Sequence, residues 1–323
     1  MEGARVLISG MGGELGSRAA VMCEQQPWIG AISGLDIDPP RRRLRRSEFH
    51  RIEPRDRRRT VQVVKEFDPQ VVLHLGIWEP YARANPRSAV ERSHAMAINV
   101  LGAAAECKSL QAIVVRSGIE IYGRRRGTAT RPDESVPVDP TSTFGRILAD
   151  IEATALRAGR AADVPVTMVR LAPVVGPHVP SPLGRYLRLP LVPVSMLADP
   201  AFSLVHVEDA GHALVAAGHR RHDGAVNVVA PGAVTATQAV RIGDRLPLPL
   251  VGPEWLVARA YAAAVGAPMP DHLLELIHRG RTADAGQMHH ALGIRPRHTT
   301  VDVVEHLFTW AGVHHPKVEK EAA

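Results

Sequence analysis

The chain has 323 residues, 45% apolar and 22% charged, a composition typical of soluble globular proteins with one large domain or two lobes. No run of about 18 apolar residues occurs, which excludes a transmembrane helix, and an apolar strand begins almost at once, so no signal peptide is expected. Cys23 and Cys107 fall in predicted helices and form no disulfide framework, so we expect a cytoplasmic protein. The 16 histidines are scattered without zinc-site spacing, and we expect no metal.

The formal net charge of +6 comes largely from one arginine-rich stretch, residues 41–46 and 57–59. A basic run of this kind can bind phosphates without sequence specificity, which keeps a nucleic-acid partner open as an alternative. However, no helix-turn-helix, RNA-recognition or aromatic-interleaved pattern accompanies it. We therefore favour a solvated surface loop and expect no specific nucleic acid partner.

The beginning of the chain predicts a dinucleotide-binding βαβ unit. Residues 5–9 predict an apolar strand, followed by a glycine-rich loop over residues 10–16, a helix over residues 17–25 and a second strand, residues 31–35, that ends at Asp36. Strand, glycine loop, helix, strand and acid in this order are typical of a nucleotide-binding fold. The alternative is a glycine-rich turn that binds nothing, which the surrounding elements disfavour.

Each part of this unit has a role in binding a dinucleotide. Gly10 permits the tight turn, Gly13 lets the pyrophosphate approach the backbone, and Gly16 lets helix and strand pack closely, while the helix N-terminus attracts the phosphates. Asp36 can accept hydrogen bonds from ribose hydroxyls and would repel a 2′-phosphate, which favours NAD over NADP, although the arginines that follow could relax this preference. The expected contacts here are Gly10, Met11, Gly12, Gly13, Glu14, Leu15, Gly16 and Asp36.

Strands and helices continue to alternate after this unit. In chain order the sequence predicts a helix over residues 60–67, a strand over 70–75, a helix over 86–110, a strand over 112–117, a loop over 131–140, a helix over 141–160 and a strand over 166–171. This alternation predicts an α/β protein with a Rossmann-type doubly wound parallel sheet.

Beyond Gly176 the pattern changes, because five prolines between residues 177 and 193 indicate loops and short pieces. One more strand is predicted over residues 226–229, and the chain from Trp255 onward predicts helices followed by a short tail. The predicted domains are an NAD-binding domain of residues 1–175, to which residues 201–230 return, and a smaller, mostly α-helical substrate lobe of residues 176–200 and 231–323.

Six motifs follow the glycine loop in a specific order: residues 73–76 (LHLG), 99–102 (NVLG), 117–123 (SGIEIYG), 170–177 (RLAPVVGP), 206–209 (HVED) and 284–296 (DAGQMHHALGIRP). Together they resemble the extended short-chain dehydrogenases/reductases of the NAD-dependent epimerase/dehydratase family, whose familiar member is UDP-glucose 4-epimerase. The resemblance implies NAD as cofactor, a nucleotide sugar as small-molecule substrate, and a homodimer formed through the helices over residues 86–110 and 141–160. It also implies cofactor contacts at Leu75, Gly76, Asn99 and Ser117.

Members of this family transfer hydride between substrate and nicotinamide, with a Tyr as acid/base, a Lys four residues later and a Ser or Thr that orients the substrate. At the matching positions this chain has Phe144, Leu148 and Gly118. Phenylalanine has no proton to exchange, and leucine has no charge with which to lower the pKa of a phenol. The resemblance therefore predicts that ordinary epimerase activity is weak, altered or absent.

Two substrate contacts of the family also differ, since Pro173 stands where the family has an Asn and Phe202 where it has an Arg. Arg279 or Arg281 could supply a diphosphate contact instead.

Other side chains could replace the missing catalytic groups. Tyr122 is a weak candidate, because the arginines at residues 124–126 could lower its pKa, and Ser117 is a second. Four further polar residues have simpler explanations as core, loop or exposed strand-end positions: His74, His178, His206 and Glu120.

The leading interpretation is a cytoplasmic, NAD-binding member of the family, a nucleotide-sugar epimerase by resemblance, whose catalytic set is replaced. Two alternatives remain open: a non-catalytic NAD-sensing or scaffold protein, and a true oxidoreductase or epimerase that uses Tyr122.

Overall fold

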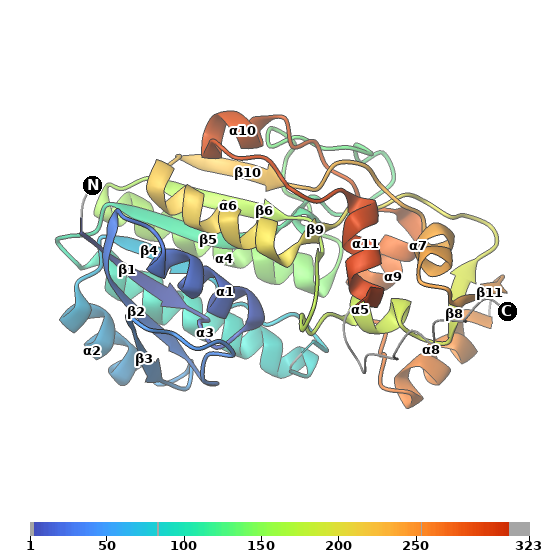
Figure 1. Cartoon of the computed structure of the whole chain (residues 1–323), viewed down its shortest axis with the longest axis horizontal. Helices are drawn as coiled ribbons and strands as arrows, with labels where there is room; N and C mark the ends of the chain where they lie inside the picture. The colour runs from blue at the N-terminus through green and yellow to red at the C-terminus, as the bar shows by residue number, and fades with distance from the viewer. Residues whose placement is uncertain (1–2, 83, 253, 310–323) are drawn as a thin grey trace, which may run out of the picture.

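The computed structural model describes residues 3–82, 84–252 and 254–309, which form a main body around one sheet and a smaller lobe at one end (Figure 1). The main sheet has seven strands, all paired in parallel. In spatial order they are β10 (Gly224–Val228), β6 (Val166–Leu171), β5 (Ala112–Gly118), β4 (Val71–His74), β1 (Ala4–Ser9), β2 (Ile29–Asp36) and β3 (Ser47–Arg51).

The strand order reverses beside β1, which pairs with β2 on one side and with β4 on the other. Loops that leave neighbouring strands in opposite directions open a crevice at the carboxyl edge, where open α/β sheets bind ligands. The predicted Rossmann-type doubly wound sheet is confirmed.

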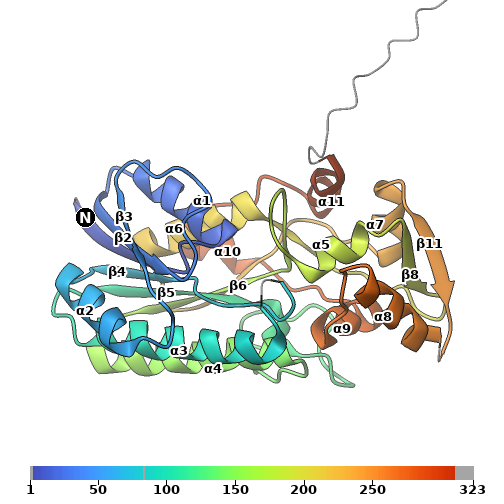
Figure 2. The ribbon, with the colours of Figure 1, turned by 90° about the horizontal axis from the view of Figure 1, so that it is seen from below.

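Helices cover both faces of the sheet, as Figure 2 shows. One layer contains α1 (Glu14–Glu24), α6 (Val207–Arg220) and α10 (Gln287–Leu292), and the other contains α2 (Arg57–Phe67), α3 (Pro86–Ala105) and α4 (Thr143–Ala162). Each face has its own apolar cluster: Val6 and Ile8 of β1 point into the first and Leu7 into the second. Burial on both faces explains why the central strands are continuously apolar.

Some helix boundaries differ from the predicted ones. The side chain of Asp56 accepts a hydrogen bond from Arg59 N at 3.0 Å, so α2 begins three residues earlier than predicted. α1 also begins three residues early, because the glycine-rich start of this helix carries no apolar period. α3 ends at Ala105 instead of residue 110, since the chain must turn to enter β5, and Cys107 therefore lies outside the helix.

The predicted surface loop is confirmed for residues 41–46, which lie in a largely exposed loop, whereas residues 57–59 form the exposed first turn of α2. Residues 47–51 form the edge strand β3, paired with β2. Arg42 Nη2 lies 2.9 Å from Glu14 Oε1, and the backbone N–H groups of Arg45 and Arg46 both donate to Glu24 Oε1 at 2.8 Å. The stretch is thus tied to α1, and part of its charge is paired.

The smaller lobe has an apolar cluster of its own. Its elements are α5 (Pro182–Leu187), β8 (Leu191–Ser195), α7 (Ala236–Ile242), β11 (Leu246–Leu250), α8 (Glu254–Ala264), α9 (Asp271–Arg279) and α11 (Thr300–Thr309). The parallel pair of β8 and β11 was not predicted, and neither was the short pair of β7 (Val174–Val175) and β9 (Val205–His206) that lies between the two parts.

The predicted division between domains is only partly reflected in the packing. α6 and β10 lie in the layers of the main body, but α10, which was predicted to belong to the lobe, packs there too through Met288 and Leu292. The exact boundaries stay a prediction, and the predicted tail lies outside the described residues. Within the described ranges, no helix is long and apolar enough to cross a membrane.

A buried polar network joins α4, β6 and β10. Arg170 forms two hydrogen bonds with the carboxylate of Glu152, at 3.0 and 2.9 Å, and donates a third to the hydroxyl of Tyr122 at 2.9 Å. This hydroxyl donates in turn to Asn227 Oδ1 at 2.8 Å. The prediction that residues 124–126 lower the pKa of Tyr122 is wrong, because burial raises this pKa and the nearby cation is Arg170.

This network predicts a strong dependence of stability on Glu152. Replacing Glu152 by Ala leaves the Arg170 charge buried without its partner and should lower the free energy of unfolding by about 3–5 kcal/mol. The double variant Glu152→Leu/Arg170→Met should lose much less, since neither charge remains. Urea unfolding measures the free energy of unfolding of both variants, and Asp150→Ala, at an exposed position on the same helix, is the control. A loss for Glu152→Ala that is no larger than the loss for the control would contradict the prediction.

Candidate active site

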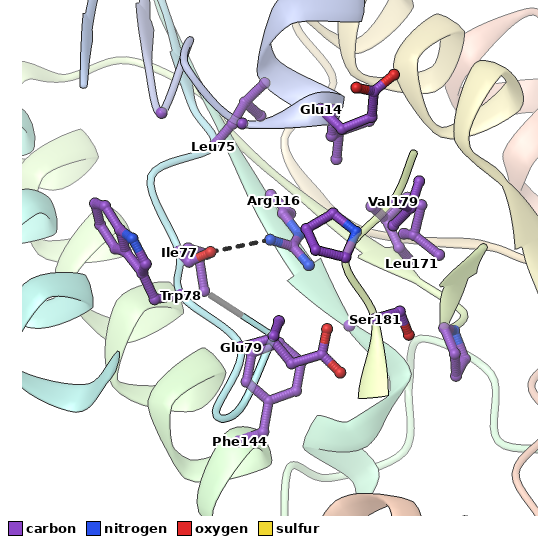
Figure 3. Close-up of a pocket in the computed structure, with 18 of the residues that line it drawn as sticks. Glu14, Leu75, Ile77, Trp78, Glu79, Arg116, Phe144, Leu171, Val179 and Ser181 are labelled. Carbon is purple, nitrogen blue, oxygen red and sulfur yellow. Dashed lines mark hydrogen bonds between the residues drawn. The ribbon is translucent and has the colours of Figure 1, made fainter. Parts of the chain in front are cut away.

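A continuous cleft runs along the carboxyl edge of the sheet (Figure 3). One end is formed by the glycine loop and Asp36, and the other by α9 of the smaller lobe. Between them lie the loop after β4, the end of β5 and Phe144 at the start of α4. The cleft therefore lies at the switch point between β1 and β4 and extends to the lobe.

The glycine loop is held by close backbone approaches. Gly10 has φ +77°, and a Cβ there would lie 2.5 Å from Gly76 N. A Cβ at Gly16 would lie 2.0 Å from the Gly10 carbonyl oxygen. Only glycine fits at these two positions. The close approaches fix the path of the loop, so that the first turn of α1 faces the cleft.

The polar groups at this end of the cleft suit a dinucleotide. Asp36 lines the cleft, and its carboxylate accepts hydrogen bonds from Gly12 N at 3.0 Å and from Ile37 N at 2.6 Å, which fix its orientation. Among the described residues, no side chain caps α1 at its N-cap residue, Gly13. The N–H groups of this first turn are thus suited to phosphate, and the Asp36 carboxylate to a ribose.

Most of the predicted cofactor contacts line this cleft, namely Gly10, Gly13, Glu14, Leu15, Gly16, Asp36, Leu75, Gly76 and Ser117. Three do not. Met11 is buried against Gly34, Gly12 packs on Asp38, and Asn99 donates to the Pro54 carbonyl oxygen at 2.8 Å, so these three support the loop structure around the cleft.

The prediction that Glu120 is exposed at a strand end is wrong. β5 stops at Gly118, and the chain continues in a 3₁₀ turn, η1 (Ile119–Tyr122), which places Glu120 in the cleft with only 5% of its surface exposed. A Cβ at Gly118 would lie 2.3 Å from Glu120 Oε2. The Glu120 carboxylate thus fills the space that a larger residue at position 118 would occupy.

Apolar side chains fill the predicted Tyr and Lys positions. Phe144 lines the cleft and packs against the ring of His272, with ring centroids 5.2 Å apart. Leu148 is buried, and its Cδ1 lies 3.0 Å from the position of a Cβ at Gly118. Neither side chain can exchange a proton.

Three charged residues that were not predicted from the sequence line the same cleft as Phe144, namely Arg116, Glu79 and His272. Arg116 projects into the cleft from β5 and donates to the Ile77 carbonyl oxygen at 3.2 Å, as the dashed line in Figure 3 shows. Glu79 lies in the loop after β4, and its Oε1 is 3.0 Å from Nε2 of His272. Arg116 could have been predicted from the sequence, because it is an arginine in an otherwise apolar strand. Glu79 lies in a loop and His272 in the distant helix α9, so only the fold shows that they lie close together.

The ring of His272 is buried between carboxylates. Burial alone would lower its pKa, but Asp271, whose Oδ1 lies 3.7 Å from Nδ1, and Glu79 outweigh burial and raise the pKa to about 9. Burial lowers the pKa of Arg116, and the negative charges of Glu79 and Glu120 partly offset this lowering. Beyond the cofactor end, the cleft therefore holds the cations of Arg116 and His272 beside the carboxylates of Glu79 and Glu120.

The remaining candidates lie in different surroundings. Ser117 lines the cleft, and its buried hydroxyl has no hydrogen-bond partner within the described part of the chain. His74 Nδ1 lies 2.8 Å from Ser9 Oγ, and burial lowers its pKa to about 3, as expected for a neutral core histidine. His178 and His206 do not line the cleft.

The two arginines proposed as diphosphate contacts also lie elsewhere. Arg279 donates to the Arg124 carbonyl oxygen, and Arg281 is buried in an ion pair with Glu275. Pro173 lines the cleft, whereas Phe202 is buried beside Val234.

The sheet order, the glycine loop and the cleft define a dinucleotide-binding protein of the Rossmann type. The model of the NAD dependent epimerase/dehydratase family matches residues 6–229, and the chain therefore belongs to this family. The predicted family is thus confirmed, and NAD is the cofactor of the family to which the chain belongs.

The chain is similar to further proteins along almost all of its length. An uncharacterized protein of Mycobacterium tuberculosis is 28% identical over 317 residues, which cover 95% of this chain and 84% of that protein. The UDP-glucose 4-epimerase of Thermotoga maritima, solved with UDP-glucose, has a TM-score of 0.72 at 15% identity, covering 94% of this chain and 97% of that one. The dTDP-glucose 4,6-dehydratase of Bacillus anthracis, solved with NAD, has a TM-score of 0.71 at 17% identity, covering 95% and 96%.

The environment of His272 predicts a pH dependence of stability. A pKa raised from 6.5 to about 9 means that protonated His272 stabilises the folded protein fully below about pH 6.5, and that this stabilisation is lost as the pH rises through 9. The free energy of unfolding should fall by at most about 3 kcal/mol over this range relative to the His272→Gln variant. Denaturant titrations at several pH values measure this difference, and equal pH slopes for both proteins would contradict it.

Proposed function

We propose that this chain is an NAD-dependent enzyme that oxidises a hydroxyl group of a nucleotide sugar, with Glu120 as the proton acceptor in place of a tyrosine. One observation carries the proposal: the Glu120 carboxylate occupies the side-chain space of Gly118, at the position where the family has its substrate-orienting hydroxyl. A carboxylate within a cleft can take a proton from a substrate hydroxyl as the hydride leaves the same carbon.

The cofactor end of the cleft supports NAD in this role. The first turn of α1 would bind the pyrophosphate, and Asp36 would bind the adenosine ribose. Bound NAD supplies the hydride acceptor. A negatively charged Asp36 at the ribose disfavours a 2′-phosphate, and Arg42, in the arginine-rich stretch that follows Asp36, is paired with Glu14.

The charged residues that line the cleft with Phe144 would position the substrate. Arg116 lies near the middle of the cleft, where Figure 3 shows it between Ile77 and Leu171, and its charge would stabilise an oxygen that becomes negative as the proton leaves. The ion pair of His272 with Glu79 joins α9 of the smaller lobe to the loop after β4 and so closes the far end of the cleft.

The substrate class rests on similarity of fold. Structures of the same fold were solved with UDP-glucose or NAD, and the cleft of this chain extends from the glycine loop past Phe144 to Ser181 and Leu276. A homodimer through α3 and α4, which pack side by side, is a further proposal, supported by the exposed Ile98 on α3. A cytoplasmic location stays a prediction.

A non-catalytic NAD-binding protein is the second candidate. It is favoured by the burial of Phe144 and Leu148, which leaves the family's acid/base positions wholly apolar. Both candidates require NAD binding and differ only in turnover. The position of Tyr122 disfavours catalysis through this residue, since its hydroxyl is buried between Arg170 and Asn227 and the residue does not line the cleft.

Cofactor binding depends on Asp36 in both candidates. The Asp36→Ala variant should bind NAD about 10- to 100-fold more weakly, because the charged hydrogen bonds to the ribose are lost. Calorimetric titration of NAD measures this change, and thermal unfolding confirms that the variant is folded. Unchanged NAD affinity in a folded variant would show that Asp36 does not contact the cofactor.

Turnover depends on Glu120 in the first candidate only. Reduction of NAD is followed by its absorbance during incubation with a panel of UDP- and dTDP-sugars. The Glu120→Gln variant should lose about 10²- to 10⁴-fold in rate while it still binds NAD, since Gln is almost isosteric but cannot accept the proton. Glu66→Gln, an exposed position on α2, is the matched control. NAD binding without turnover for any sugar of the panel supports the non-catalytic candidate instead.

A further inference from the structure

Three histidines from distant parts of the sequence meet outside the cleft. His206 is the N-cap residue of α6, His298 precedes α11, and His306 lies within α11. The ring centroids of His206 and His298 are 4.1 Å apart, and His306 lies 5.3 and 5.2 Å from them. One ring nitrogen of each lies within 4.8 Å of the others.

His298 is oriented by a buried carboxylate. Its Nδ1 lies 2.9 Å from Asp209 Oδ2, so the protonated Nδ1 donates to the carboxylate and leaves the Nε2 lone pair for a ligand. The same carboxylate accepts the backbone N–H groups of Arg297 and His298, both at 3.1 Å, and is therefore firmly held. A carboxylate, a histidine and a metal in this order are common in zinc sites.

Among the described residues, His206 has a buried ring nitrogen with no hydrogen-bond partner. This nitrogen is Nε2, and the side chain is almost fully buried. Its Nδ1 accepts the Glu208 N–H at 3.3 Å, a long bond. Coordination through Nε2 moves the ring proton to Nδ1 and ends this bond at the start of α6.

We propose that His206, His298 and His306 bind one divalent transition-metal ion of the zinc type. Imidazole nitrogens select such metals, and three of them leave the fourth tetrahedral position for water. Tetrahedral coordination at about 2.0–2.1 Å needs nitrogens roughly 3.3 Å apart, so the side chains must close by about 1.5 Å at most from their separation of 4.8 Å or less.

The proposed metal has a structural role. None of the three histidines lines the cleft, so the ion is separate from the proposed NAD chemistry. His306 belongs to the last described helix of the smaller lobe, whereas His206 joins β9 to α6 of the main body. Binding one ion therefore fixes α11 to the main body, and it stabilises the folded protein by linkage.

The test uses the full chain, expressed without a histidine tag, treated with a chelator and dialysed. Co²⁺ is added first, because four-coordinate Co²⁺ absorbs visible light strongly, and Zn²⁺ is then measured by calorimetry. We expect one ion per chain with micromolar or tighter affinity, displacement of Co²⁺ by Zn²⁺, and a higher melting temperature with metal.

Variants distinguish this site from adventitious binding by other histidines. His298→Gln and His306→Gln should each weaken Zn²⁺ binding at least tenfold and abolish the Co²⁺ band, while Asp209→Asn should weaken binding about 10- to 100-fold. His289→Gln, at an exposed position on α10, is the matched control and should bind as the parent does. Circular dichroism confirms that each variant is folded. Absence of stoichiometric binding in the parent, or binding unchanged in folded His298→Gln and His306→Gln, overturns the proposal.

Discussion

The architecture of the site depends on the close approach of the glycine loop to the neighbouring strand ends. Gly10 adopts a positive φ and leaves no room for a Cβ against Gly76, and Gly16 lies directly on the Gly10 carbonyl group. This contact fixes where α1 begins and turns its first N–H groups toward the cleft. Because β1 and β4 adjoin at the switch point, the same contact joins the loop after β4 to the cofactor end.

The site chemistry follows from two coupled changes at the end of β5. Gly118 has no side chain, and the 3₁₀ turn that follows returns the Glu120 carboxylate into the space left free. Either change without the other would produce a clash or a cavity. Together with Phe144 and the paired charges of Glu79 and His272, they would give the proposed enzyme a carboxylate in place of a tyrosine as its acid/base group.

The sequence predicted the sheet, the glycine loop and Asp36, because each depends on local pattern: continuous apolar strands, glycine spacing and an acid at a strand end. The sequence did not predict the burial of Glu120, because side chains alternate between the two faces only along a strand, and here the strand is followed by a 3₁₀ turn. The approach of His272 to Glu79 and that of His206 to His298 join residues far apart in the chain. Only packing of the smaller lobe on the main body brings such pairs together.

A crystal structure of the NAD complex would show whether NAD binds in the cleft with its nicotinamide beside Glu120. We expect the pyrophosphate at the first turn of α1, the adenosine ribose on Asp36, and the nicotinamide ring near Ser117 with its reactive face toward the Glu120 carboxylate. A complex in which the nicotinamide lies away from Glu120, or crystals that take up no NAD at saturating concentration, would contradict this expectation.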